Sequence, residues 1–249
     1  MPDMKRNAQF TWRSAFSSDP GPRRPANEDA WLDAAEIGVW AVADGMGGHD
    51  AGQVASRMVI DALGNVRKMA TQVGLVETVK QRVNDVNRRL REIGKSQFDG
   101  RTIGSTVAVL CAVDRQVVCL WAGDSRIYRM RGGHLIQMTK DHSPLEELID
   151  EGLINRKDAK KHRLSNVITR AVGADDTLDL DSRSGDAQDG DVFLLCTDGL
   201  NKVVSDDEIG QTLLAGDCQE IVKALVHLSL VRKVSDNVTV GAVRFDETN

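Results

Sequence analysis

The 249-residue sequence has few aromatic side chains, no long hydrophobic run and only a small excess of charge. Aromatic residues make up 4% of the chain, and 37 acidic residues against 32 basic ones leave a net charge of −5. A nucleic-acid binder needs a basic surface, often with interleaved aromatic rings, so we expect no nucleic-acid partner. The longest apolar runs lie near 37–43 and 117–122. Both are far shorter than the roughly 20 residues of a membrane-spanning helix, so we expect no insertion into a membrane.

Cysteine is also scarce, with only Cys111, Cys119, Cys196 and Cys218. Their spacing matches neither a CxxC metal site nor the phosphate loop of a phosphatase with a cysteine nucleophile, which excludes both classes. Three of them lie in apolar runs, which predicts buried free thiols in a reducing compartment. Residues 1–13 contain no apolar stretch of the kind found in signal peptides. We therefore expect a cytoplasmic protein.

Proline is rare along the chain and marks few boundaries between structural elements. Three of the five prolines lie within 20–25, and none occurs between Ala26 and Ser143. The cluster predicts a rigid loop before the first strand. No internal repeat or low-complexity linker divides the rest of the sequence, so we expect one domain.

Hydrophobic periodicity predicts strands and helices in alternating blocks. The clearest helix has apolar residues at steps of three and four, namely Val76, Val79, Val83, Val86, Leu90 and Ile93. Strands are predicted at 37–43, 105–113, 117–123, 127–131, 134–138 and 192–196 and from Val238 onwards, and Ser143 and Ser205 each begin a capping box. Gly132–Gly133 predicts a tight turn between two of these strands. This order favours an α+β fold, with helices packed outside paired antiparallel sheets.

Acidic residues stand where several predicted strands end or begin. They are Asp44, Asp124 and Asp198 after three apolar strands, Asp236 before the last strand, and Glu28–Asp29 before the first. A buried carboxylate is costly unless it is paired or bound to a metal, and a set of oxygen ligands suits Mg²⁺ or Mn²⁺. A single Asp-Gly is usually only a turn. The recurrence of acids at strand ends therefore favours a metal centre.

Two further segments have alternative interpretations. Residues 44–49 could form a glycine loop around phosphate, but they lack the ending of a P-loop and the spacing of a dinucleotide motif. Residues 175–191 contain seven aspartates and one arginine. They could attract basic phosphopeptides or cations, although we favour a solvated loop before the next strand.

Six short motifs occur in one order along the chain. They are Arg24-x-x-Asn27-Glu28-Asp29, Val42-Ala43-Asp44-Gly45-Met46-Gly47-Gly48-His49, Gly104-Ser105-Thr106, Gly123-Asp124-Ser125-Arg126, Cys196-Thr197-Asp198-Gly199-Leu200 and Asp236-Asn237-Val238-Thr239. Together they resemble the bacterial form of the PPM family of metal-dependent protein phosphatases, the type 2C-like serine/threonine phosphatases. The resemblance implies one phosphatase domain over 10–245. Its fold would be a four-layer α-β-β-α sandwich of two antiparallel sheets flanked by helix pairs, with a flap subdomain at 139–173.

The resemblance also implies a centre of two Mn²⁺ or Mg²⁺ ions and a weaker third site. By motif position, Asp44 would bridge the two ions and Gly45 would contribute its backbone carbonyl. Asp198 and Asp236 would ligate the first ion. A water shared by two such ions has a lowered pKa and supplies hydroxide near neutral pH, which would attack the phosphorus of phosphoserine or phosphothreonine.

The remaining matched positions imply supporting roles. Glu28 and Asp29 would act mainly through metal-bound waters, and Asp124 would hold the third ion together with Asp198. Arg24 would bind the substrate phosphate with its planar donor fork, so Arg24, Asp44 and Asp198 are the expected catalytic residues. The substrates would be phosphorylated proteins, made by a eukaryotic-like Ser/Thr kinase that this phosphatase opposes. We expect a monomer.

One position departs from the pattern of many eukaryotic relatives. They carry a histidine directly after the first Asp-Gly, whereas this chain has Met46, which cannot donate a proton. His49 is a candidate to bind substrate or donate that proton, or else a loop residue of the glycine turn. For His142 and His162 we favour surface or capping contacts, and His134 and His227 are assigned to structural positions.

Two other functions fit the same motifs. A non-catalytic relative would only bind phosphoproteins, but such a protein would be expected to lose a metal aspartate, and every matched aspartate is present. A general phosphomonoesterase or diesterase would keep the same metal centre, and only substrate profiling separates it from a protein phosphatase.

Overall fold

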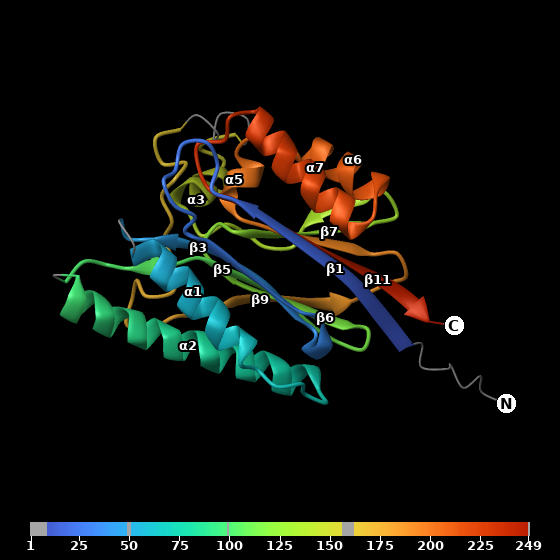
Figure 1. Ribbon diagram of the computed structural model, residues 1–249, viewed down its shortest axis with the longest axis horizontal. Coiled ribbons are helices and arrows are strands. Elements are labelled where there is room, and N and C mark those ends of the chain that lie inside the picture. Colours follow the sequence, from blue (N-terminus) through green and yellow to red (C-terminus); the bar gives the residue numbers. More distant parts are fainter. Residues whose placement is uncertain (1–8, 49–50, 99, 156–161, 249) are drawn as a thin grey trace.

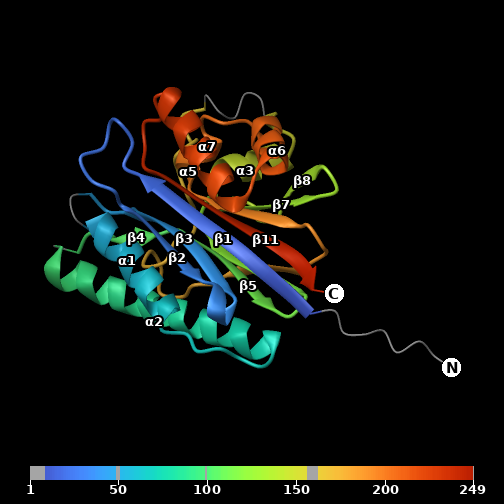
Figure 2. The same cartoon turned by 45° about the vertical axis from the view of Figure 1, so that its right-hand side comes forward.

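Two antiparallel β-sheets stack face to face, and helices cover the outer face of each (Figures 1 and 2). The computed structural model describes residues 9–48, 51–98, 100–155 and 162–248. The α+β sandwich predicted from the sequence is confirmed. The layers follow the order helices, sheet, sheet, helices.

The first sheet has five strands in the order β1-β11-β10-β7-β8. Their bounds are Gln9–Asp19 for β1, Arg126–Arg131 for β7, His134–Gln137 for β8, Val192–Cys196 for β10 and Val238–Thr248 for β11. β1 and β11 pair along their whole length, from Gln9 opposite Thr248 to Asp19 opposite Val238. The predicted turn at Gly132–Gly133 joins β7 to β8, and both glycines adopt positive φ, 53° and 83°.

The second sheet has six strands, five of them in the order β2-β3-β5-β6-β9 with β4 beside β3. The bounds are Asp29–Ala34 for β2, Val39–Met46 for β3, Gly104–Ser105 for β4, Val107–Val113 for β5, Gln116–Ala122 for β6 and Asp181–Asp186 for β9. A 3₁₀ turn, η1 (Ala35–Ile37), joins β2 to β3. The strand predicted at 37–43 therefore starts later and continues to Met46, so Asp44 lies within the strand.

Helices α1 (Ala51–Gly64) and α2 (Gln72–Gln97) cover the six-stranded sheet, and α6 (Asp206–Ala215) and α7 (Cys218–Val231) cover the other. The shorter α3 (Pro144–Asp150) and α5 (Asp198–Asn201) lie in the connections. Ser205 and Glu208 form the predicted capping box. Ser143 accepts a hydrogen bond from the Glu146 backbone, but the return bond from Glu146 is absent. None of the helices in the described ranges is long and apolar enough to cross a membrane.

Three apolar layers separate the four layers of structure. One lies between α1, α2 and the six-stranded sheet, and another between α6, α7 and the five-stranded sheet. The third fills the space between the sheets and includes Trp40, Phe193 and Phe245, all fully buried. The rings of Phe193 and Phe245 meet edge to face, with centroids 5.4 Å apart. All four cysteines are buried and free, as predicted.

The structure differs from the predicted elements at several places. Residues 181–186 were assigned to a solvated loop, but they form β9, an edge strand that pairs with β6. Its side chains are almost all exposed, so its formation depends on backbone pairing and leaves no hydrophobic pattern in the sequence. The proline-rich segment 20–25 follows β1 and therefore does not precede the first strand. The elements β1, β2 and α7 were not predicted.

We expect Phe193→Ala to lower the free energy of unfolding by about 3–5 kcal/mol, because it opens a cavity between the two sheets. Val73→Ala is the control, since Val73 is 75% exposed and its truncation should change stability by less than about 0.5 kcal/mol. Urea unfolding followed by circular dichroism measures both. Equal effects of the two variants would contradict this description of the core.

Candidate active site

The two sheets bring the predicted acidic residues to one region of the molecule. Asp29 at the start of β2 is the register partner of Asp44 in β3. Asp198 follows β10 as the first residue of α5, and Asp236 lies two residues before β11. Asp124 lies in the short connection between β6 and β7. The ends of neighbouring strands in the two sheets therefore bring together acids that are far apart in the sequence.

The five aspartates affect one another electrostatically. Burial raises the pKa of Asp44 well above its ordinary value, and the charges of Asp29, Asp198, Asp124 and Asp236 raise it further. Burial and neighbouring acids also raise the pKa of Asp198, although Lys202 opposes the shift. The pKa values of Asp29 and Asp124 are raised to about 7, first by burial and then by other carboxylates. The site thus concentrates negative charge where water stabilises it poorly.

The carboxylate of Asp29 is held from the opposite sheet. Its Oδ2 accepts hydrogen bonds from Thr197 Oγ1 at 2.8 Å and from Thr239 Oγ1 at 2.7 Å. Thr197 Oγ1 also accepts a bond from the Thr239 backbone at 3.0 Å. Asp29 Oδ1 is buried without a hydrogen-bond partner in the described part of the chain. This oxygen is free to bind a cation or a cation's water ligand.

Asp44 is positioned through its backbone by the motif Gly104-Ser105-Thr106. The Asp44 amide donates to Thr106 Oγ1 at 3.0 Å, and the Thr106 amide donates to the Asp44 carbonyl at 2.8 Å. Thr106 Oγ1 in turn shares a hydrogen bond of 2.7 Å with Ser125 Oγ. The third and fourth sequence motifs therefore contribute a frame that fixes the end of β3.

Gly45 allows three chain segments to approach closely. Its amide donates to the Glu28 carbonyl at 3.1 Å. A Cβ at Gly45 would lie 2.0 Å from the carbonyl oxygen of Gly52 in α1, and a Cβ at Gly52 would lie 2.7 Å from Glu28 Oε1. Side chains at either position would therefore push α1 and the Glu28 carboxylate away from β3.

Asn237 fixes the loop that carries Arg24 and Glu28. Its Oδ1 accepts from the Glu28 amide at 2.8 Å. Its Nδ2 donates to the carbonyls of Pro20 at 2.9 Å and Ala26 at 3.0 Å. One side chain from the last motif therefore shapes the connection between β1 and β2.

Two cations lie among the acids. Arg24, predicted to bind phosphate, forms an ion pair with Asp236 at 2.9 Å, and 46% of its side chain is exposed. Lys202, which the sequence analysis did not identify, forms an ion pair with Asp198. The i,i+4 spacing of Asp198 and Lys202 at the start of a helix could have predicted this ion pair from the sequence.

The donor set suits a hard divalent cation, because it consists of carboxylate and carbonyl oxygens. Asp198 Oδ1, like Asp29 Oδ1, is buried without a hydrogen-bond partner among the residues that the structure describes. However, within those same ranges no three Asp, Glu, His or Cys side chains already converge as ligands of one ion. Asp198 and Asp236 instead contact Lys202 and Arg24. Binding a cation through the paired oxygens of Asp198 and Asp236 would therefore require these ion pairs to open.

The predicted flap segment, 139–173, is attached to the site at its beginning. Arg126, two residues after Asp124, binds Asp141 through both Nε and Nη2, at 2.9 and 2.7 Å. His142 exchanges two hydrogen bonds with Gly123, its amide donating at 3.0 Å and its Nδ1 accepting at 3.1 Å. The connection that bears Asp124 and the start of this segment thus form one hydrogen-bonded unit.

The histidines differ from one another in role. His142 was assigned to surface or capping contacts, but its side chain is only 11% exposed and stacks on Trp121, with ring centroids 6.2 Å apart. Burial lowers its pKa. His162 Nδ1 accepts a hydrogen bond from the Leu164 amide at 3.3 Å within a turn. His134 and His227 are exposed on β8 and α7, and His49 lies outside the described residues.

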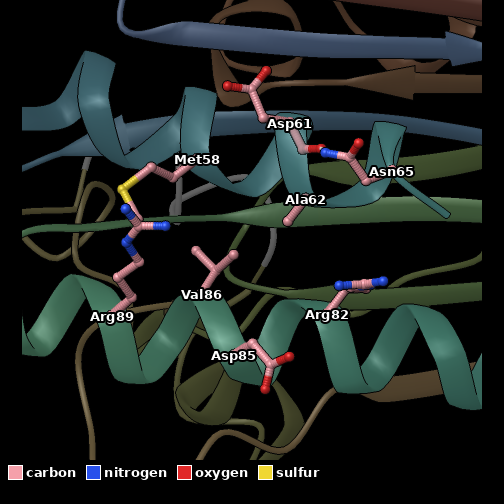
Figure 3. Close-up of a pocket in the computed structure, with 8 residues that line it drawn as sticks. All are labelled: Met58, Asp61, Ala62, Asn65, Arg82, Asp85, Val86 and Arg89. Carbon is pink, nitrogen blue, oxygen red and sulfur yellow. The ribbon is translucent and has the colours of Figure 1, made fainter.

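A separate groove of about 430 Å³ lies between α1 and α2 (Figure 3). Arg82 and Arg89 extend from α2 towards α1, where Asp61 and Met58 form part of the opposite wall. None of the predicted site residues lines it. The carboxylate cluster between the sheets is therefore the stronger candidate for chemistry.

Comparison with known proteins gives consistent matches. A family model described as Protein phosphatase 2C matches residues 24–233. Protein phosphatase PhpP of Streptococcus pneumoniae is 32% identical over 239 residues, which cover 92% of this chain and 96% of the relative. The structure of PppA, a key regulatory component of T6SS in Pseudomonas aeruginosa, is 40% identical with a TM-score of 0.89, covering 97% of this chain and 100% of that one.

A third relative was solved with metal bound. The catalytic domain of the serine/threonine protein phosphatase PstP, in complex with two manganese ions, is 32% identical with a TM-score of 0.87. The alignment covers 95% of this chain and 99% of that one. Fold and relatives together define a protein-serine/threonine phosphatase. The chain belongs to the protein phosphatase 2C family, because the family model spans most of its length.

We expect Gly199→Ala to lower the free energy of unfolding by about 1–3 kcal/mol, because it overpacks the site. A Cβ at Gly199 would lie 1.9 Å from the Asn237 carbonyl oxygen, whereas one at Gly185 in β9 would meet nothing within 4 Å. Gly185→Ala should therefore leave stability nearly unchanged. Urea unfolding compares them, and an unaffected Gly199→Ala would contradict the close approach of α5 and Asn237.

The raised carboxylate pKa values also predict how stability depends on pH in EDTA. With folded-state pKa values of about 7, Asp29 and Asp124 hold protons that the unfolded chain releases above its ordinary carboxyl pKa. Stability should therefore fall as pH rises from about 4, the ordinary carboxyl pKa, to about 7, by on the order of 4 kcal/mol per carboxyl group, and level off above this range. Urea unfolding at several pH values measures the slope. Asp29→Asn should flatten it, and an unchanged slope in this variant would contradict the assignment.

Proposed function

We propose that this chain hydrolyses phosphoserine and phosphothreonine in proteins with the help of two divalent cations, Mn²⁺ or Mg²⁺. The observation that carries the proposal is the set of buried carboxylates that raise one another's pKa at the junction of the two sheets. The two manganese ions of the related PstP domain support it.

The charge balance of the site supports two divalent ions. Among the described residues, Arg24 and Lys202 each form an ion pair with one of six acidic side chains, and the charge of Arg126 also acts on one of them. The acids are Glu28, Asp29, Asp44, Asp124, Asp198 and Asp236. The acids outnumber these cations, and divalent cations would offset the excess negative charge. Buried charge of this kind is otherwise very costly.

We assign the ligand roles by motif position. Asp44 would bridge the two ions, with the Gly45 carbonyl beside it, and Asp198 and Asp236 would bind the first ion. Glu28 and Asp29 would act through bound waters. The hydroxyls of Thr197 and Thr239 leave Asp29 Oδ1 free for that contact. Asp124 and Asp198 would provide the weaker third site.

When bound, such cations lower the pKa of a water molecule and draw charge from the phosphoryl oxygens. Arg24 would contribute a second source of positive charge, because its guanidinium can turn from Asp236 to two phosphoryl oxygens. Nearly half of its side chain is exposed, so an incoming phosphate can reach it. Met46 cannot protonate the leaving oxygen, and His49 is our candidate for that step, directly or through water.

The physiological setting belongs to the same proposal. We infer phosphoprotein substrates, produced by a Ser/Thr kinase that the enzyme opposes, and a monomeric protein of the cytoplasm. PppA is called a regulatory component of T6SS in P. aeruginosa. Its similarity to this chain makes control of such a machinery one setting to test.

The direct test is phosphate release from a phosphothreonine peptide with Mn²⁺. We expect release that is abolished by EDTA and reduced at least 100-fold in Asp44→Asn, because the bridging ligand is lost. Asp207→Asn is the matched control, since this aspartate of α6 is exposed and is not one of the six acids of the cluster, and it should retain full activity. Release that persists in EDTA would contradict the metal requirement. A preference for small phosphomonoesters or diesters over the peptide would favour a general phosphoesterase.

A further inference from the structure

Lys202 is the one basic side chain that contacts Asp198 in the described structure. It follows α5 directly, and its amide donates to the Asp198 carbonyl at 3.0 Å, which completes the first helical turn. The same turn brings its ammonium group to Asp198 Oδ2. Only 28% of the lysine side chain and 10% of the aspartate side chain are exposed. The pair therefore lies mostly inside the site.

Lys202 also acts on two other acids of the cluster. Its ammonium interacts favourably with the charges of Asp124 and Asp236 as well as with Asp198. Asp124 makes no hydrogen bond or ion pair with any other described side chain. The nearby Arg126 is committed to Asp141 and to the Tyr128 hydroxyl, which it reaches at 2.9 Å. The charges of Lys202 and Arg126 both favour ionised Asp124, and of these two residues only Lys202 also forms an ion pair with Asp198 in the described structure.

The two oxygens of Asp198 have different environments. Oδ1 is buried and has no hydrogen-bond partner in the described ranges, whereas Oδ2 contacts the lysine. A cation can therefore bind Oδ1 while the ion pair persists. A further ion between Asp198 and Asp124 would have to compete with the ammonium group for Oδ2.

We propose that Lys202 acts as an internal cation between Asp198 and Asp124, and that it weakens the binding of a third divalent ion there. The proposal rests on the proposed two-ion site. A divalent ion in this space would either be repelled by the ammonium or displace it, and both cost free energy at short range in a partly buried site. The side chain thereby favours a centre with two tightly bound ions.

The test is the number and affinity of bound Mn²⁺ ions. Purified wild-type protein, stripped with EDTA and dialysed, is titrated with Mn²⁺ while electron paramagnetic resonance measures the free ion. We expect two ions in the wild type with a weak third. In Lys202→Met the third ion should bind at least tenfold more tightly, because the competing charge is gone. Lys223→Met, which removes an exposed lysine of α7, should match the wild type.

Two further variants test the position of the third ion. Lys202→Arg keeps the charge and should keep the third ion weak. Adding Asp124→Asn to Lys202→Met should abolish the gain, because the second carboxylate is lost. Circular dichroism verifies folding, and Lys202→Gln replaces any Lys202→Met preparation that does not fold.

The outcomes separate this inference from the proposed function. A wild type that binds no Mn²⁺ overturns the two-ion site itself. Two ions in the wild type, with the same weak third ion in Lys202→Met, overturns the role of Lys202 and leaves the two-ion site intact. A tighter third ion that survives the added Asp124→Asn change places the effect elsewhere and also overturns the inference.

Discussion

Repulsion among buried carboxylates is the constraint that the structure around the candidate site has to satisfy. Burial raises the pKa of Asp29, Asp44, Asp124 and Asp198, and the charges of neighbouring aspartates raise these pKa values further. Such a cluster persists only if the surrounding structure holds it in place and positive charge offsets it. The stacked sheets provide the first condition, because both contribute acids of the cluster. Arg24 and Lys202 provide part of the second.

Several residues of the six motifs hold in place the segments that carry the acids. Thr106 and Asn237 bind backbone groups of the segments that carry Asp44, Glu28 and Arg24, and Ser125 holds the Thr106 hydroxyl. Thr197 and Thr239 hold Asp29 directly. These residues are close to the acids in the motifs. Their short polar side chains hold the acids in position through hydrogen bonds.

The sequence predicted those parts of the fold that have a strong hydrophobic signal. The stripe from Val79 to Leu90 corresponds to the buried face of α2, and the apolar runs correspond to the central strands. It did not predict β9, whose exposed polar side chains carry no pattern and which forms by pairing with β6. This strand was missed because it lies at the edge of the sheet, where its formation depends on pairing with a strand that is distant in the sequence.

The candidate site was predictable to a similar degree and for similar reasons. Aspartates at strand ends are visible in the sequence because they interrupt apolar runs, and the structure brings them together. The ion pair of Lys202 with Asp198 and the threonine bonds to Asp29 were not predicted, because common polar residues give no signal until the backbone places them. The roles of the ligands still rest on the family motifs.

The hydrogen bonds to Asp29 have a mechanical consequence. This carboxylate belongs to the six-stranded sheet, but the hydroxyls that hold it belong to the end of β10 and to β11 of the other sheet. A shift of one sheet over the other, by even part of a residue, would stretch both bonds at once. The geometry of the site therefore depends on how the two sheets are aligned. Packing between the sheets, well away from the acids, sets the shape of the place where the chemistry would occur.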